Sequence, residues 1–160
     1  MSTCCGSTNY RAVAEWVNAA RGNIPQNAVQ GGYDGRDIIY IGRAHQQGEV
    51  VPGKVVPSHG CCYIPWSGME HSHKDYQVLV NRNGSILEWH NMSNGLTPTG
   101  AIQGGRTNTG EPLFIGRVDY NGTKTVGKVH PSHGVLYISF GGKEISHSNY
   151  EVLVAKYLQL

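Results

Sequence analysis

Two short segments hold the side chains best suited to bind a ligand. The first, residues 30–36 (Gln-Gly-Gly-Tyr-Asp-Gly-Arg), carries a carboxylate, an aromatic ring and a guanidinium group among glycines. The second ends at Lys54, which follows a glycine and precedes a valine, as Lys128 does later in the chain. A carboxylate accepts hydrogen bonds and an ammonium group donates them, so both segments could face a polar ligand. The alternative for each lysine is a solvated or salt-bridged side chain that binds nothing else.

Histidines recur at matched places, in Pro-Ser-His-Gly at His59 and His133 and in Ser-His at His73 and His147. Closed zinc sites use four Cys or His ligands, but the spacing here matches no familiar zinc motif. We therefore expect no metal site and interpret these histidines as turn residues that bond to the backbone. A mild pH response of binding is the open alternative, because histidine titrates near neutrality.

The sequence offers little support for an enzyme. It has no nucleophile elbow, phosphate-binding loop or dinucleotide fingerprint. Each half of the chain has one acidic residue close to a histidine, Glu70 or Glu144. Each of these acids lies two residues after a glycine, which favours a role in fixing a turn. We expect no catalytic residues, no cofactor and no enzymatic activity.

The four cysteines form two adjacent pairs, Cys4-Cys5 and Cys61-Cys62. Where the second pair would recur, the chain has Val135-Leu136, so aliphatic side chains also fit that place. Cys61 and Cys62 are therefore interpreted as small buried hydrophobic residues. Bridging between molecules through Cys4 or Cys5 is the alternative for the first pair.

The chain contains an internal duplication, because the stretch from Trp16 to Val80 returns, lightly edited, from Trp89 to Val154. Both copies contain Gln-Gly-Gly, Ile-Gly-Arg, Gly-Lys-Val, Pro-Ser-His-Gly and Val-Leu-Val in the same order. The second copy has one extra residue between Gly105 and Phe114. Two copies favour a pseudo-symmetric unit over a solenoid, which needs three or more. We expect a single domain over 1–160, with repeat one at about 14–80 and repeat two at about 87–154.

Short apolar runs bounded by glycines are typical of β-strands. Strands are predicted in repeat one and at the matching places in repeat two: 38–44, 53–56, 61–65, 113–118, 127–130 and 135–140. Asn83-Gly84 stands between two further runs, 78–80 and 85–89, and predicts a hairpin that joins the repeats. By the duplication, 150–154 should pair with the other opening strand, 10–16, which would interlock the two halves.

The composition supports an all-β chain that is low in charged residues. The 160 residues include 22 glycines, and hydrophobic residues make up 39% against 15% charged. A net charge of +2 without basic runs gives no case for nucleic acid or an anionic membrane. The first six residues are polar and lack the apolar core of a signal peptide. We expect a chain that does not insert into membranes and is cytoplasmic, or secreted by an unconventional route.

Taken together, these spaced matches resemble the DM-nine repeat family over nearly the whole chain, in both copies. That family includes tandem-repeat mannose-binding lectins and the lectin-like head of natterin-type proteins. The resemblance implies a sandwich-like all-β module of interlocked repeats, mannose-type glycan binding and homodimers. It assigns the sugar to the aspartate of the Gly-Gly loop and the lysine of Pro-Gly-Lys, here Asp34 and Lys54. Lys128 matches in repeat two, where Thr107 or Asn108 stands in place of the aspartate and marks a possible second site.

Elementary chemistry agrees with these implied roles. Hydroxyl groups of a hexose can donate to Asp34 and accept from Lys54, and charge-assisted hydrogen bonds are the stronger kind. Gly32 lets a ring approach the backbone, and Tyr33 could stack on the sugar or only pack. The predicted function is a lectin for mannose-containing glycans, a soluble pattern-recognition or agglutinating protein of innate immunity. The alternative is an intracellular interaction or stress-associated module without a sugar ligand.

Overall fold

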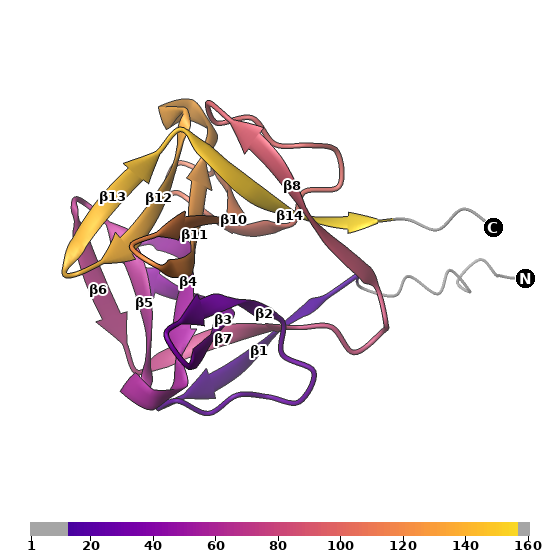
Figure 1. Cartoon of the computed structure of the whole chain (residues 1–160), viewed down its shortest axis with the longest axis vertical. Helices are drawn as coiled ribbons and strands as arrows, with labels where there is room; N and C mark the ends of the chain where they lie inside the picture. Colours follow the sequence, from indigo (N-terminus) through magenta and orange to yellow (C-terminus); the bar gives the residue numbers. More distant parts are fainter. Residues whose placement is uncertain (1–12, 157–160) are drawn as a thin grey trace, which may run out of the picture.

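The computed structural model describes residues 13–156, which form an all-β fold (Figure 1). Repeat one supplies seven strands: β1 Glu15–Ala20, β2 Gln30–Asp34, β3 Asp37–Gln46, β4 Glu49–Val56, β5 Cys61–Trp66, β6 Met69–His73 and β7 Asp75–Val80. Repeat two supplies seven more: β8 Ile86–Ser93, β9 Gln103–Arg106, β10 Pro112–Tyr120, β11 Thr123–His130, β12 Val135–Phe140, β13 Lys143–His147 and β14 Asn149–Lys156. One 3-10 turn follows β4 (η2, Pro57–His59) and its counterpart follows β11 (η3, Pro131–His133). The predicted fold class is confirmed, and Cys4 and Cys5 lie outside the described residues.

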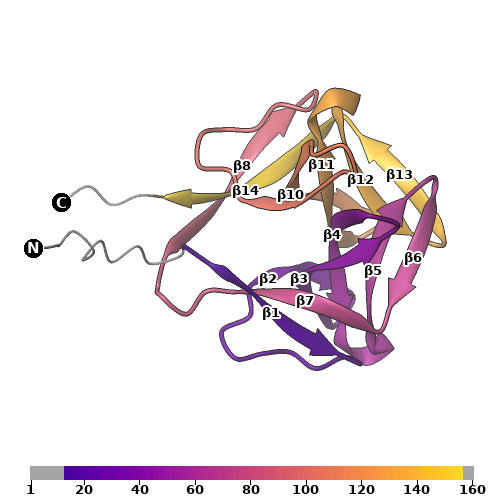
Figure 2. The same ribbon diagram turned by 180° about the vertical axis from the view of Figure 1, so that it is seen from behind.

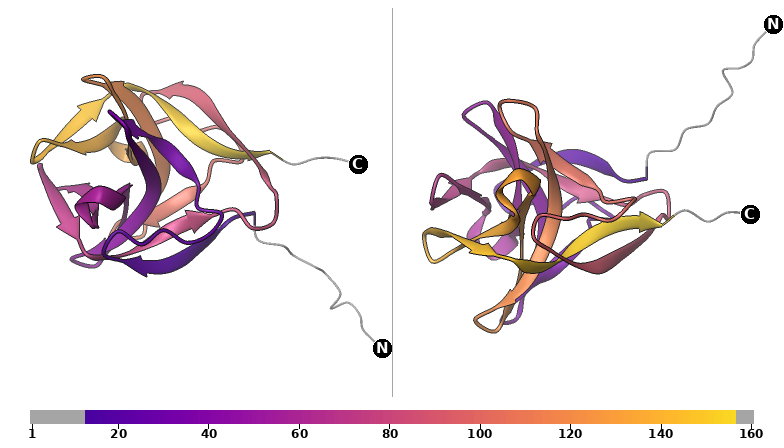
Figure 3. Two further views of the ribbon diagram at one scale, coloured as in Figure 1. Left: turned by 60° about the horizontal axis from the view of Figure 1, so that its bottom comes forward. Right: turned by 90° about the horizontal axis from the view of Figure 1, so that it is seen from above.

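The strand order is symmetric. It reads the same from either end when each strand is replaced by its counterpart in the other repeat. It runs β1-β7-β3-β2-β11-β12-β13-β6-β5-β4-β9-β10-β14-β8, and additional β3–β4 and β10–β11 pairings close it into a ring. The two repeats meet in the pairs β2–β11, β4–β9 and β6–β13. From behind, the β5–β6 and β12–β13 hairpins meet along one side of the molecule (Figure 2). The two colour-coded halves stay interleaved in both views of Figure 3. The repeats are therefore interlocked, as predicted.

The predicted pairings between the repeats' end strands are wrong. The strand that closes repeat one, β7, pairs with the strand that opens repeat one, β1, from Glu15 opposite Val80 onward. In the same way β14 pairs with β8 of its own repeat. Asn81 explains the connection: its side chain accepts from the Ser85 N–H and donates to the Ser85 carbonyl, which forms a wide turn that separates β7 from β8. Of the predicted 10–16 strand, Val13 and Ala14 lie outside β1, and residues 10–12 are not described.

The glycine doublet of each repeat lies in a strand, not in the predicted loop. Gly32 is in β2, where a Cβ atom would lie 1.9 Å from the carbonyl oxygen of Lys124 in repeat two. Gly105 stands in the same relation to the carbonyl oxygen of Val50 in repeat one. The close approach that these glycines allow is thus between the backbones of the two repeats.

Replacing Gly32 with alanine should therefore be costly. The added methyl would collide with backbone rather than with a flexible side chain, so we expect a loss of about 3 kcal/mol in the free energy of unfolding. Gly35→Ala is the matched control: φ is +60° there and nothing lies within 4 Å, so only about 1 kcal/mol of backbone strain is expected. Urea denaturation measures both, and equal losses would contradict this account of β2.

Aliphatic side chains from both repeats form the core. One buried cluster joins Ile39 and Ile41 of repeat one to Ile115 and Val126 of repeat two. Cys61 and Cys62 are buried free thiols, as interpreted from the sequence, and burial raises the pKa of Cys62. Within residues 13–156 the chain has no helix that could span a membrane.

Candidate functional site

Lys54 is enclosed at the contact between the repeats. It is a β4 residue, and its Nζ donates to the carbonyl oxygen of Ser139 in repeat two at 2.8 Å. The Glu70 carboxylate lies 3.8 Å from the same Nζ, and the rings of Tyr63 and Phe140 lie at 5.8 and 5.0 Å. Burial lowers the pKa of Lys54, whereas the charge of Glu70 acts to raise it. The ion-pair partner of Lys54 is therefore Glu70.

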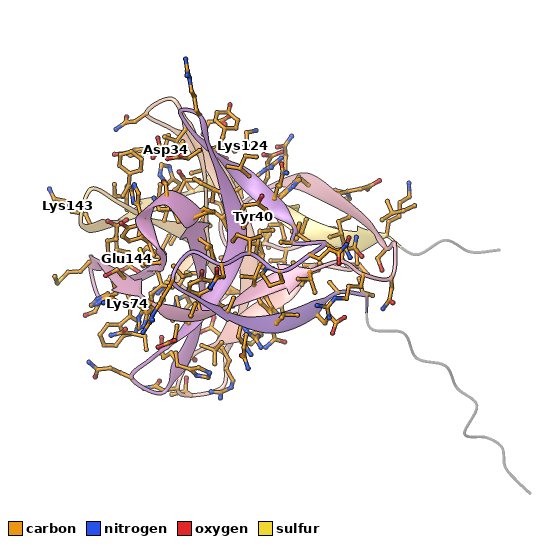
Figure 4. All side chains as sticks on the ribbon, turned by 90° about the horizontal axis from the view of Figure 1, so that it is seen from below. Asp34, Tyr40, Lys74, Lys124, Lys143 and Glu144 are labelled. Carbon is orange, nitrogen blue, oxygen red and sulfur yellow. The ribbon has the colours of Figure 1, made fainter. Side chains whose placement is uncertain are left out.

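Asp34 is exposed, at the end of β2. Its charge acts to raise the pKa of Lys54, although the two side chains form no ion pair within the described residues. Figure 4 shows Asp34 at the same end of the molecule as Lys124, whose backbone pairs with Tyr33. Tyr33 is 48% exposed, so its ring face is open to solvent. The structure thus places the accessible carboxylate of Asp34 where its charge acts on Lys54, with the ammonium group itself covered, whereas the Tyr33 ring lies beside Lys124.

Repeat two has an open hollow at the corresponding place. Its volume is about 440 Å³, within the roughly 300–1,000 Å³ usual for small-molecule sites. We call it the repeat-two hollow; its walls include all three residues predicted for the possible second site, Lys128, Thr107 and Asn108. Glu144 and Tyr137 of repeat two also line it, and Glu49 and Trp66 come from repeat one.

Lys128 and Glu144 lie together in this hollow. Lys128 Nζ is 3.1 Å from Glu144 Oε2, and the two side chains are only 6% and 10% exposed. Glu144 Oε2 is buried and accepts no hydrogen bond in the part of the chain described. Of the rings in residues 13–156, Tyr137 is the one within cation–π distance of Lys128 Nζ, at 5.3 Å. The Lys128 side chain is as buried as that of Lys54, but within residues 13–156 no carbonyl accepts from Lys128 Nζ as Ser139 does from Lys54, which leaves N–H groups of Lys128 for a ligand that enters the hollow.

The repeat-one residues explain why this hollow is open. Trp66 occupies the place that Phe140 has in the other repeat, and its indole N–H donates to Glu49 Oε1 at 3.1 Å. The Trp66 ring also packs edge-on against His71. At the repeat-one place the arrangement differs. Phe140 lies on the Lys54 ammonium group, and the position that matches Glu49 is occupied by Thr123, which has no carboxylate. Glu49 thus holds the larger ring at the rim of the hollow.

Glu49 also holds the Thr107-Asn108 segment, which occupies the position that matches Asp34 of repeat one. Its Oε2 accepts from the backbone N–H of Asn108 at 3.2 Å. Thr107 is buried, and its hydroxyl lies 3.1 Å from that of Thr109, while Asn108 is exposed. Repeat two has no aspartate in the position that matches Asp34. The carboxylate of Glu49, from repeat one, lies at the same rim of the hollow instead.

Glu70 and Glu144 each join the two repeats. Glu144 Oε1 accepts from the backbone N–H of Gly68 at 2.9 Å, and Glu70 Oε1 accepts from that of Gly142 at 3.2 Å. Two backbone hydrogen bonds join the same four residues. The Glu70 N–H donates to the Gly142 carbonyl, and the Glu144 N–H donates to the Gly68 carbonyl. The sequence interpretation that each acid fixes a turn is thus correct, but the turn belongs to the other repeat. We call this arrangement the reciprocal clasp.

The prediction that the recurring histidines bond to the backbone is wrong for His59, His73 and His133, whose ring nitrogens contact side chains. His59 Nδ1 lies 2.8 Å from the Tyr63 hydroxyl, and His133 Nδ1 lies 2.9 Å from that of Tyr137. His73 contacts the Gln46 side chain at 2.8 Å. No group of three or more Cys, His, Asp or Glu side chains in residues 13–156 is arranged to hold a metal ion.

A model of the DM9 repeat family matches residues 33–147. The chain belongs to the DM9 repeat family. Natterin-4 of Thalassophryne nattereri is 34% identical over 142 residues, which cover 87% of this chain and 33% of that protein. Natterin-3 of the same species is 28% identical over 152 residues, covering 86% of this chain and 39% of its relative. This DM9 repeat protein thus spans little more than a third of the length of these curated relatives.

The fold of the DM9 repeat protein also resembles that of a solved structure, the nematode sperm cell motility protein MFP2B. The TM-score is 0.65, with 97% of this chain and 52% of the other covered. Because the two sequences are only 17% identical, this likeness concerns the fold alone.

Proposed function

We propose that this DM9 repeat protein is a lectin that binds mannose-type glycans, without catalysing a reaction. The observation that carries the proposal is the Lys128–Glu144 pair in the open repeat-two hollow, with Tyr137 and Trp66 on its walls. An ammonium donor beside a carboxylate acceptor suits neighbouring hydroxyl groups, each of which both donates and accepts. Aromatic rings offer apolar faces for the C–H groups of a sugar.

The repeat-one place is proposed as a second, unlike saccharide site. There Asp34 and Tyr33 are exposed, and Gly32 brings their strand against repeat two. Lys54 already donates to Ser139, so a ligand at this place would depend mainly on the carboxylate of Asp34. We therefore expect weaker binding at repeat one than in the repeat-two hollow.

Two modest sites on one chain are useful when the target displays many copies of a sugar. Each site competes with water for hydroxyl groups, so single-site affinity should be low. Linked sites raise the overall affinity through effective concentration, and a homodimer would double their number. This supports a role in recognising or agglutinating glycan-coated particles, as in innate immunity.

A glycan array tests the proposal, and Asp34→Ala tests the repeat-one assignment. We expect retention on mannosides, and about tenfold weaker binding at repeat one for Asp34→Ala, since a charge-assisted hydrogen bond is lost. The melting temperature should not change, because Asp34 is exposed. Asp75→Ala, an exposed aspartate of β7, is the control and should bind like the wild type. Silence across all mannosides would contradict the proposed function.

A further inference from the structure

Two stacked imidazole rings form part of the wall of the repeat-two hollow. The centroids of His130 and His133 are 3.5 Å apart and the ring planes differ by 10°. His130 Nε2 lies 3.2 Å from Glu111 Oε1, and His133 Nδ1 lies 2.9 Å from the Tyr137 hydroxyl. Repeat one has no such pair, because Val56 occupies the place of His130.

The surroundings of His130 suit its neutral form. Its Nδ1 is buried and has no hydrogen-bond partner among the described residues, while Nε2–H can donate to Glu111. Protonation would put a second N–H on Nδ1, where no acceptor lies, and a buried donor without an acceptor is costly. With both rings charged, two positive charges would also lie face to face at the distance of a stacked pair.

The neighbouring charges act in both directions. The titratable or charged groups that face the histidine pair are Glu111 before β10, Lys128 on β11 and Tyr137 on β12, with Glu49 of β4 and Glu144 of β13 across the hollow. Burial lowers the pKa of His130 below its ordinary 6.5, and His133 and Lys128 lower it further. Glu111 acts to raise that pKa but does not reverse the shift.

Glu111 connects the histidine pair to the rest of the wall. Its Oε2 accepts from the Ser132 N–H at 2.8 Å, and its Oε1 accepts from the Ser132 hydroxyl at 2.7 Å. A movement of His130 away from Glu111 or His133 would therefore disturb the η3 turn that carries Ser132. That turn lines the same hollow as Lys128.

We propose that acidification reshapes the repeat-two hollow, because protonation of His130 separates the histidine stack, and that a saccharide bound there is released as the pH falls from neutral into the acidic range. The release rests on the proposed function, whereas the reshaping does not. The pKa of His130 is lower in the folded chain, so the stacked form is intact at and above neutral pH. It is lost as the pH falls through the pKa of His130 in the folded chain, which lies below the ordinary histidine value.

NMR spectroscopy of the ligand-free chain tests the reshaping. As the pH is lowered from 7.5 to 5, we expect the imidazole signals of His130 to titrate, with the His133 ring and Ser132 amide signals moving in the same step because the stack separates. In His130→Val, which copies Val56, the Ser132 amide should stay in place. Titration of His130 with unmoved His133 ring and Ser132 amide signals would overturn the proposal.

Methyl α-mannoside, followed at the Trp66 indole N–H signal, tests the release. Wild type should bind about tenfold more weakly at pH 5 than at pH 7.5, and His130→Val should differ less than about twofold between the two. His133→Gln should also lose the dependence, while His59→Gln, in the matching repeat-one motif, should keep it. Equal pH dependence in wild type and His130→Val would overturn the release. No mannoside binding at any pH, with the His133 ring and Ser132 amide signals still following the titration of His130, would refute the lectin function and support the reshaping.

Discussion

Replacing Glu144 with alanine is expected to lower the free energy of unfolding by about 3–5 kcal/mol. The change leaves the Lys128 ammonium, at 6% side-chain exposure, without its counter-ion at 3.1 Å. It also removes the acceptor for the Gly68 N–H and so breaks one of the four hydrogen bonds of the reciprocal clasp between the repeats. Loss of one partner from a buried ion pair is destabilising because the other charge stays desolvated.

Glu70→Ala, the same change in repeat one, is the matched comparison. Lys54 keeps its hydrogen bond to the Ser139 carbonyl, and its distance to Glu70 is already 3.8 Å, so a smaller loss is expected. The double variant Lys128→Met with Glu144→Leu removes both charges and should recover much of the stability. Urea denaturation measures all three. A loss below about 1 kcal/mol for Glu144→Ala would mean that the pair is effectively solvated.

Lys128→Met is expected to weaken methyl α-mannoside binding in the repeat-two hollow by about tenfold to a hundredfold. A hydrogen bond from a charged donor contributes about 1.5–3 kcal/mol, and the methionine keeps the chain length without the donor. Isothermal titration calorimetry measures the affinity, and Lys143→Met, an exposed lysine at the start of β13, is the control. Unchanged affinity in Lys128→Met would remove the central residue from the site.

Trp66→Phe provides a test that leaves the Lys128–Glu144 pair intact. Phenylalanine lacks the indole N–H that Glu49 accepts, so the ring should move toward Lys128, as Phe140 lies on Lys54. The hollow would then narrow and mannoside binding would fall, with little change in the melting temperature. Retained affinity would indicate that the rim does not depend on the Trp66–Glu49 bond.

The sequence predicted the main strands because these depend on local signals. Short apolar runs around Ile41 and Ile115 give strands, and the duplication gives their matching places. The interlocking was predicted from end-strand pairings that are wrong, and it comes instead from the pairs β2–β11, β4–β9 and β6–β13. The predicted β7–β8 hairpin failed because Asn83-Gly84 indicates only that the chain turns. Which strands then pair depends on packing between segments far apart in the sequence, such as Glu15 opposite Val80.

The candidate site could be predicted only in part for the same reason. Lys128, Thr107 and Asn108 were identifiable because they match positions in repeat one. The contributions of Glu49 and Trp66 were missed, since each acts in the repeat to which it does not belong. A signal was present in the sequence: Glu49 and Trp66 differ from their counterparts Thr123 and Phe140, and such differences can mark where two pseudo-symmetric sites diverge.

Crystals of the unmodified chain soaked with methyl α-mannoside test the central claim most directly. We expect the sugar in the repeat-two hollow, with a hydroxyl oxygen within hydrogen-bond distance of Lys128 Nζ, beside the Glu144 carboxylate, and its ring near Trp66 or Tyr137. An empty hollow at saturating mannoside, or a sugar bound only at places that contact neither Lys128 nor Glu144, would contradict it.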